Sequence, residues 1–246
     1  MRVDLIMNES IILIVNADDF GHSQGVNQGV IQSHEQGVVT SASLMVRGEE
    51  ADAAAAYARC HPDLSVGLHI DLGEWRFCEG QWLPVYTVVP LEDFELVGAE
   101  IHRQLALFRR LLQRNPTHLD SHQHIHRHGA ALKVAVELAR ELRVPLRHQC
   151  AKVRYCGEFY GQPLPLASER DSVSVAALLG IISALAPGIT ELACHPGCDE
   201  GLKSDYAKER LWETATLCDP AVRSAIENAS VQLRSFDSSE VRGRLN

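Results

Sequence analysis

Short apolar runs alternate with segments of helical periodicity along almost the whole chain. The run IILIVNA at residues 11–17 is nearly continuous in apolar residues, which is typical of a strand buried on both faces. The segment AEIHRQLALFRRLLQRN instead repeats its apolar residues at helical spacing. The pattern predicts seven strands, at residues 11–17, 38–46, 64–72, 117–122, 145–150, 189–197 and 231–237. It predicts helices between them, at residues 26–37, 49–60, 99–115, 130–143, 175–186 and 206–218.

Strands that alternate with helices indicate a parallel α/β fold. The chain has no linker-like stretch and no shift in composition, so one domain is predicted over residues 1–246. No GxGxxG follows the first strand, so nothing supports a dinucleotide-binding sheet. Four polar motifs, ADD, LHID, DSHQHIH and CHPG, lie at or just past the carboxyl ends of predicted strands. Active sites are built on that face of a (β/α) barrel, so a barrel with about seven parallel strands is predicted.

The overall charge argues against one class of partner. The 246 residues carry a formal net charge of −9, whereas nucleic acid or an anionic membrane requires a basic face. No apolar run approaches the ~20 residues that a membrane-spanning helix needs. The first apolar run leads directly into NADDFG, which indicates a core strand and not a signal peptide. The seven cysteines form no CxxC pair, and together these features predict a cytoplasmic protein with reduced thiols.

The stretch HLDSHQHIHRH at residues 118–128 concentrates histidines at alternate positions. In an extended strand, residues two apart share a face, so Asp120, His122, His124 and His126 could all point inward. Burying several polar rings costs on the order of a few kcal/mol each unless a metal ion or mutual hydrogen bonds compensate. A solvated, histidine-rich surface loop is the alternative, and the alternation disfavours a helix.

Two other motifs offer further metal ligands. A mononuclear hydrolytic site usually takes about three protein ligands. Asp18, Asp19 and His69 lie at the ends of other predicted strands. Taken singly, the aspartates could cap a helix and the histidine could be a hydrogen-bonded core residue, but their joint appearance favours a metal site. Neighbouring strand residues point oppositely, so both aspartates reach one site only if the strand has ended there, a bend that Gly21 permits.

The motifs NADDFG, GLHIDL, THLDSHQHIH and CHPG resemble, in order and spacing, those of the YdjC-like carbohydrate deacetylases, the group that includes diacetylchitobiose deacetylase. The resemblance runs from about residue 11 to about residue 215. It implies a distorted (β/α) barrel of about seven parallel strands that hydrolyses the N-acetyl group of an acetamido sugar with one divalent metal ion. The residues that match the metal-ligand positions are Asp19, His69 and His122. The match makes Asp18 the catalytic base and His195 the acid, a residue whose reference pKa of about 6.5 lets it carry a proton near neutrality.

Three polar residues of the histidine-rich stretch then fall outside the predicted ligand set. Asp120 is assigned to orienting a histidine ligand, as carboxylates near metal sites commonly do. His124 or His126 could replace His122 as a ligand, and only the family match decides against them. The flanking pattern C-H-x-x-C at Cys194 is a weak alternative zinc site, because that cysteine falls inside a predicted strand.

Aromatic residues offer candidate contacts to a sugar. The loop GEWRFCEGQWLPVY contains Trp75 and Trp82, whose rings either stack on sugar faces or pin the loop to the barrel. Tyr160, in FYGQ, is a second substrate-contact candidate and rests on the resemblance alone. Arg210 and Glu213 lie three apart on a predicted helix, which favours a structural ion pair over a catalytic role.

Two other functions compete with deacetylation. A metal-dependent phosphoesterase would need basic residues to hold phosphate, and only Arg127 and Arg147 lie near the motifs. A non-enzymatic, histidine-rich metal-binding protein would not require Asp18, His69 and His195 at separate strand ends.

The ligand types favour zinc, nickel or cobalt over magnesium, although members of the similar family are often assigned magnesium. The expected partner is a small acetylated sugar, without nucleic acid or a membrane span. The sequence leaves the oligomeric state open; a homodimer is an arrangement that the resemblance implies.

Overall fold

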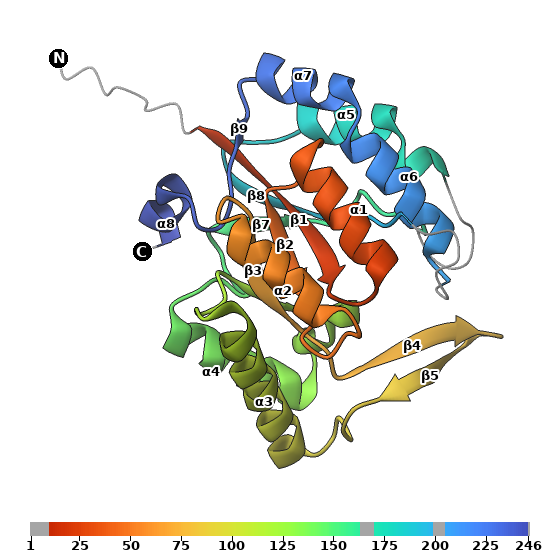
Figure 1. The fold of residues 1–246 in the computed structure, drawn as a ribbon, viewed down its shortest axis with the longest axis vertical. Coiled ribbons are helices and arrows are strands. Elements are labelled where there is room, and N and C mark those ends of the chain that lie inside the picture. The colour runs from red at the N-terminus through yellow and green to blue at the C-terminus, as the bar shows by residue number, and fades with distance from the viewer. Residues whose placement is uncertain (1–9, 163–169, 199–204, 246) are drawn as a thin grey trace.

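A curled parallel sheet forms the centre of the computed structural model, which describes residues 10–162, 170–198 and 205–245 (Figure 1). The strand order is β6-β3-β2-β1-β8-β7, with β9 paired to β1, and every pairing is parallel. The middle strand, β1, is buried over almost its full length, as its apolar sequence predicts. The strands are β1 (Ile11–Phe20), β2 (Ser41–Leu44), β3 (Ser65–Ile70), β6 (Leu119–Ser121), β7 (Val153–Cys156), β8 (Gly188–Cys194) and β9 (Gln232–Leu233).

Helices cover the outside of this sheet (Figure 1). In α3 the apolar residues Val97, Ile101, Leu105 and Phe108 recur every three or four positions and are buried, so one face of the helix packs on the core. Ser23, Asp93 and Ser174 cap α1, α3 and α5 by accepting backbone N–H groups of the first turn, as N-cap residues do. The helices are α1 (Gln24–Glu35), α2 (Ala51–Cys60), α3 (Phe94–Leu112), α4 (Gly129–Leu142), α5 (Val175–Ser183), α6 (Ala207–Leu217), α7 (Pro220–Asn228) and α8 (Ser239–Leu245), with 3-10 turns η1 (His122–Arg127) and η2 (Arg170–Val173).

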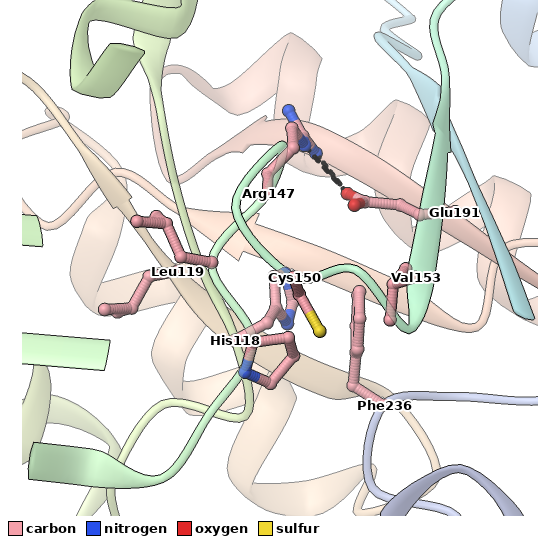
Figure 2. A pocket seen from close by; sticks show the side chains of 9 residues that line it. His118, Leu119, Arg147, Cys150, Val153, Glu191 and Phe236 are labelled. Atoms are coloured by element: carbon pink, nitrogen blue, oxygen red, sulfur yellow. Dashed lines mark hydrogen bonds and ion pairs between the residues drawn. The ribbon is translucent and has the colours of Figure 1, made fainter. Parts of the chain in front are cut away.

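The predicted distorted barrel within a single α/β domain is confirmed, and it is open between β6 and β7. The strand predicted at residues 145–150 is wrong: only Leu146 bridges to Leu119, and the strand itself begins at Val153. The backbone turns after Leu146 because Gln149 donates to the Leu146 carbonyl, and His148 adopts a left-handed φ of 63°. A small cavity of about 10 Å³ lies at this gap, and Arg147, Glu191 and Phe236 are among the residues that line it (Figure 2).

The stretch predicted as a long loop is an antiparallel hairpin that projects from the barrel (Figure 1). Its strands are β4 (Gly73–Cys78) and β5 (Gln81–Thr87). Glu79 and Gly80 both have positive φ, which suits the twist of a two-residue hairpin turn. The two predicted tryptophans lie on one face of the hairpin, because Trp75 and Phe77 are two apart and Phe77 pairs with Trp82.

The histidine-rich stretch is extended only as far as Ser121, so the predicted run of inward-facing histidines is wrong beyond that residue. A 3-10 turn follows, in which Gln123 and His124 have φ of 49° and 55°. The turn is stabilised by Ser121, whose hydroxyl accepts the backbone N–H of His126. Helices α7 and α8 were not predicted; they are only 9 and 7 residues long. Within the described part of the chain, no helix combines the length and apolar character needed to cross a membrane.

The backbone of the HPG motif packs directly on α1 at a glycine. A Cβ atom at Gly29 would lie 2.3 Å from the Cα of Gly197. Replacing Gly29 by alanine should therefore lower the free energy of unfolding by about 1–3 kcal/mol, because the helix and the loop must separate. Gly180→Ala in α5 is the control, since a Cβ there meets nothing within 4 Å and alanine favours a helix. Equal urea midpoints for the two variants would contradict this packing.

Candidate active site

Both aspartates of NADDFG reach the carboxyl end of the sheet through an irregularity in β1. The register between β1 and β2 shifts between Ala17 and Phe20, and Asp19 has a left-handed φ of 63°. The strand therefore continues to Phe20, and the bend lies at Asp19 itself instead of at Gly21 as predicted. Both carboxylates are buried, and the irregularity lets neighbouring residues serve one site.

Asp19 stands between two imidazoles. Its Oδ1 lies 3.0 Å from Nδ1 of His122 and 3.3 Å from Nε2 of His69. The potential ligand atoms of the three residues all lie within 4.8 Å of one another. Nε2 of His122 is also buried, without a hydrogen-bond partner among the described residues. One carboxylate and two imidazoles are a donor set that suits a divalent transition metal, so the residues present fit such an ion.

His69 is oriented by Asp120, as the sequence predicts for a carboxylate near a ligand. Nδ1 of His69 lies 2.8 Å from Oδ1 of Asp120, and the hydroxyl of Ser43 donates to Oδ2 of Asp120 at 2.6 Å. Burial by itself lowers the pKa of His69, but the carboxylates of Asp120, Asp19 and Asp18 outweigh it and raise the pKa to about 10. Without a metal, this imidazole therefore carries a proton at neutral pH.

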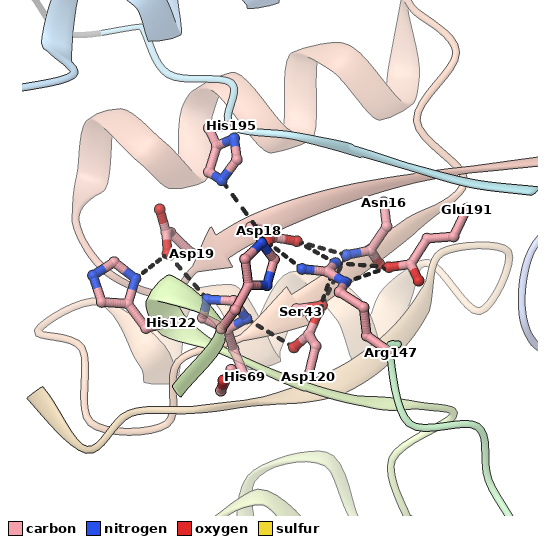
Figure 3. A network of polar contacts seen from close by, with 12 residues as sticks. Asn16, Asp18, Asp19, Ser43, His69, Asp120, His122, Arg147, Glu191 and His195 are labelled. Carbon is pink, nitrogen blue, oxygen red and sulfur yellow. Dashed lines mark hydrogen bonds and ion pairs between the residues drawn. The ribbon is translucent and has the colours of Figure 1, made fainter. Parts of the chain in front are cut away.

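Sequence analysis noted Arg147 only as a basic residue near the motifs and gave it no role in this site. Its guanidinium donates to both oxygens of Asp18 at 2.6 and 2.7 Å, and it lies 2.7 Å from Asp120 and 2.7 Å from Glu191 (Figure 3). Burial raises the pKa of Asp18, but Arg147 outweighs that effect and holds the pKa below its ordinary value. Burial prevails at Glu191 and raises its pKa to about 7. Asp18, His69 and Asp120 also form a three-residue group, but this cation already neutralises both of its carboxylates.

His195 approaches Asp18 from the end of β8 (Figure 3). Its Nε2 lies 3.8 Å from Oδ2 of Asp18, and its backbone N–H donates to Glu213. Glu213 also accepts the hydroxyl of Tyr206 at 2.5 Å, and burial raises its pKa to about 8. Burial lowers the pKa of His195 to about 4 despite both nearby aspartates, so the expected protonated imidazole is neutral in this state.

Arg210 serves the site and does not form the predicted structural ion pair. Its Nη2 lies 2.5 Å from Oδ2 of Asp19, on the side of the carboxylate opposite the imidazoles. Burial raises the pKa of Asp19, but Arg210 and His122 outweigh it and hold the pKa well below its usual range. The predicted helix around Arg210 is correct, but no pattern in the sequence indicates that this face meets β1.

The remaining histidines of the stretch lie outside the Asp19 group. His126 is held by the Ser121 hydroxyl at 2.6 Å and by the Arg147 carbonyl at 3.0 Å. Nε2 of His124 lies 3.2 Å from the hydroxyl of Tyr155. Neither is therefore placed to replace His122.

The predicted aromatic contacts differ in their distance from the site. The ring of Tyr160 stacks on Tyr206 at 4.7 Å and meets His195 edge-on at 5.4 Å. The backbone of Trp75 is held by both ends of the Gln123 amide, next to His122. Trp82 is 59% exposed, farther along the hairpin.

Comparison with known proteins places this arrangement in a family. The model of the YdjC-like proteins matches residues 12–228. The chain belongs to the YdjC-like family. A carbohydrate deacetylase of Brevibacillus brevis is 34% identical over 91% of this chain and 98% of its own length. A chitooligosaccharide deacetylase of Serratia marcescens is 32% identical over 92% of this chain and 98% of its own.

Solved structures share the fold of this YdjC-like protein. An Enterococcus faecalis protein described as a cellobiose-phosphate cleavage protein has a TM-score of 0.75 and 25% identity, covering 93% of this chain and 98% of its own. A family 4 carbohydrate esterase from Streptomyces lividans, solved with acetate, has a TM-score of 0.55 over 92% of each chain. At 12% identity, that second likeness concerns the fold alone.

Removing the Arg147 guanidinium should destabilise the protein strongly. Arg147→Met leaves three buried carboxylates without their cation, so the free energy of unfolding should fall by about 3–5 kcal/mol at pH 7. Because Arg147 depresses the pKa of Asp18, its contribution is present above the ordinary pKa of an aspartate and is lost as the pH falls through the depressed value. The loss should therefore shrink in acid. Urea unfolding at pH 7 and at about pH 2.5, below the ordinary pKa of an aspartate, measures it.

Arg127→Met is the matched control, because that side chain is exposed and should change stability by less than about 0.5 kcal/mol. Similar unfolding free energies for the two variants at pH 7 would show that the buried charge network contributes little.

Proposed function

We propose that this YdjC-like protein uses a divalent metal ion to remove the N-acetyl group of an acetamido sugar of the N-acetylglucosamine type, releasing acetate. The observation that carries the proposal is the Asp19–His69–His122 group beside Asp18 and His195, at the carboxyl end of the sheet. The named deacetylase relatives support a carbohydrate deacetylase, and chitooligosaccharides are the substrate class that one of them suggests.

The metal would be held by Asp19, His69 and His122. When bound, it polarises the acetyl carbonyl and makes water easier to deprotonate. Asp120 fixes the ring of His69 so that Nε2 faces Asp19, and Arg210 holds the other oxygen of Asp19. Zinc, nickel, cobalt and magnesium remain the predicted candidates.

Asp18 takes the proton of the attacking water. Arg147 keeps this carboxylate ionised and fixes both of its oxygens, so the base is ready at neutral pH. Water adds to the acetyl carbon, and the C–N bond then breaks. The amine must leave with a proton, and the neutral ring of His195 can accept the proton from Asp18 and deliver it to the nitrogen.

The competing functions have less support from the described residues. Phosphate would need an available cation, but Arg147 and Arg210 are both occupied by carboxylates. Metal storage would use the histidines together, whereas His126 is held by Ser121 and the backbone of Arg147. Cytoplasmic location and a homodimer stay predictions from the sequence.

Replacing Asp18 by asparagine should lower kcat for N,N′-diacetylchitobiose by ~10²–10⁴-fold, because the base is lost. Acetate release by metal-reconstituted protein measures the effect, and a chelated sample should release none. Metal binding should persist, since Asp18 is not in the ligand group. The control is Asp63→Asn, whose side chain is 75% exposed, and its activity should match the native protein. Undiminished turnover in a folded Asp18→Asn protein would remove Asp18 from the mechanism.

Metal binding should release about one proton near neutral pH, because a ligating imidazole must be neutral and His69 is protonated without metal. Below its raised pKa of about 10, the proton competes with the metal. Apparent affinity should therefore rise about tenfold per pH unit between pH 6 and 9. Calorimetry in buffers of different ionisation enthalpy measures the proton, and His69→Gln should abolish both the release and most of the affinity. Binding without proton release would contradict this ligand assignment.

A further inference from the structure

A cluster of two histidines and a tyrosine lies beside the catalytic residues and is not used by the proposed mechanism. The ring centres of His124 and His148 are 5.0 Å apart. The Tyr155 ring lies 5.4 Å from His124 and 4.3 Å from His148. The three side chains come from η1, from the turn after Leu146 and from β7, so the fold gathers them from separate segments.

Two nitrogens of this cluster are buried without hydrogen-bond partners among the described residues. They are Nδ1 of His124 and Nε2 of His148. The neighbouring His126 shows the contrast, because both of its ring nitrogens have partners. Buried polar atoms without partners are unfavourable, and two of them on neighbouring rings indicate a group that they bind.

The backbone that presents the two histidines is in an unfavourable conformation. His124 and His148 have φ of 55° and 63°, and Gln123, next to His124, has φ of 49°. Residues other than glycine rarely adopt this region, and such strain is concentrated at ligand sites. The strain and the unpaired nitrogens are independent observations on the same two residues.

The cluster adjoins the base on the Arg147 side. The guanidinium carbon of Arg147 lies 5.2 Å from the centre of the Tyr155 ring, and the same guanidinium donates to Asp18. His195, at the end of β8, lies 3.8 Å from Asp18, and the ring of Tyr160 packs against His195. A molecule that reacts at Asp18 can therefore extend over the cluster.

The chemistry of the cluster favours hydroxyl groups. Nδ1 of His124 and Nε2 of His148 both lack a partner, and an imidazole nitrogen can donate or accept a hydrogen bond according to the tautomer. Hydroxyls also donate and accept, and the Tyr155 ring offers an apolar surface for the C–H face of a sugar. In the described residues no third imidazole, carboxylate or thiolate completes a metal site with these histidines.

We propose that His124, His148 and Tyr155 form a binding subsite for the sugar unit that flanks the one being deacetylated. The inference rests on the proposed function and deepens it, because it makes the preferred substrate an oligosaccharide of at least two units. The subsite binds the flanking unit and takes no part in the chemical step.

The test compares a one-unit with a two-unit substrate. His124→Asn and His148→Asn keep a residue that tolerates positive φ but shorten the side chain. In metal-reconstituted protein, each variant should raise KM for N,N′-diacetylchitobiose by ~3–10-fold, the effect of one lost hydrogen bond, with kcat unchanged. The kinetic constants for N-acetylglucosamine should stay within about twofold. His102→Ala, an exposed histidine on α3, should change neither substrate.

Calorimetry of chelated protein with diacetylchitobiose separates binding from hydrolysis. The variants should bind the disaccharide more weakly, by the same factor as the rise in KM. An equal rise in KM for both sugars, or a fall in kcat, would overturn the subsite. The cluster would then support the catalytic residues instead. A metal content that falls from two ions to one in His148→Asn would overturn it in favour of a second metal site.

The two proposals fail in different ways. If the folded, metal-loaded native protein hydrolyses neither sugar, the proposed function fails. The subsite would still be supported if the chelated native protein bound the disaccharide and His124→Asn and His148→Asn bound it more weakly. If hydrolysis occurs but His124→Asn and His148→Asn change the ratio of the two KM values no more than His102→Ala does, the subsite proposal fails and the proposed function stands.

Discussion

One buried guanidinium holds the site and the barrel together. Arg147 meets the carboxylates of Asp18, Asp120 and Glu191, which come from β1, β6 and β8. Asp120 lies on the edge strand β6, and Glu191 lies on β8, which pairs with the other edge strand β7, so the cation links the two sides of the gap between β6 and β7. The backbone of the same residue donates to the carbonyl of Leu119, which ties it to β6. Opening this contact would separate Asp18 from Asp120, the residue that contacts His69.

Much of the fold could be predicted because the strands are buried on both faces. The near-continuous apolar run of β1 and the helical spacing of α3 are strong patterns, and the structure confirms both. The strand predicted at residues 145–150 failed because only Leu146 bridges to a neighbouring strand, and the chain turns at His148, which has a left-handed φ. The hairpin was missed because both faces of β5 are exposed, so hydrophobic alternation, which reports burial, gives no signal.

The sequence predicts the candidate site residues that belong to motifs at strand ends. It does not predict the residues that only tertiary contacts bring to the site. Asp19, His69 and His122 come from separate motifs, yet each lies at a strand end, and the sheet brings strand ends together. Arg147 and Arg210 follow no such rule, because their side chains reach the site from a turn and from a helix face. The alternating histidines wrongly predicted a strand beyond Ser121. The chain forms a 3-10 turn there, with left-handed residues, so the histidine side chains do not share one face as they would in a strand.

The charges of the site explain how it can favour loss of a proton. Burial raises the pKa of Glu191 to about 7 and that of Glu213 to about 8, so both hold protons for much of the time at neutral pH. The ionised aspartates are then balanced by the two arginines and the protonated His69. If the proposed divalent ion bound and displaced one proton from His69, the buried site would gain a net positive charge. That charge would favour loss of a proton from a water molecule, and Asp18, which Arg147 keeps ionised, is positioned to take that proton.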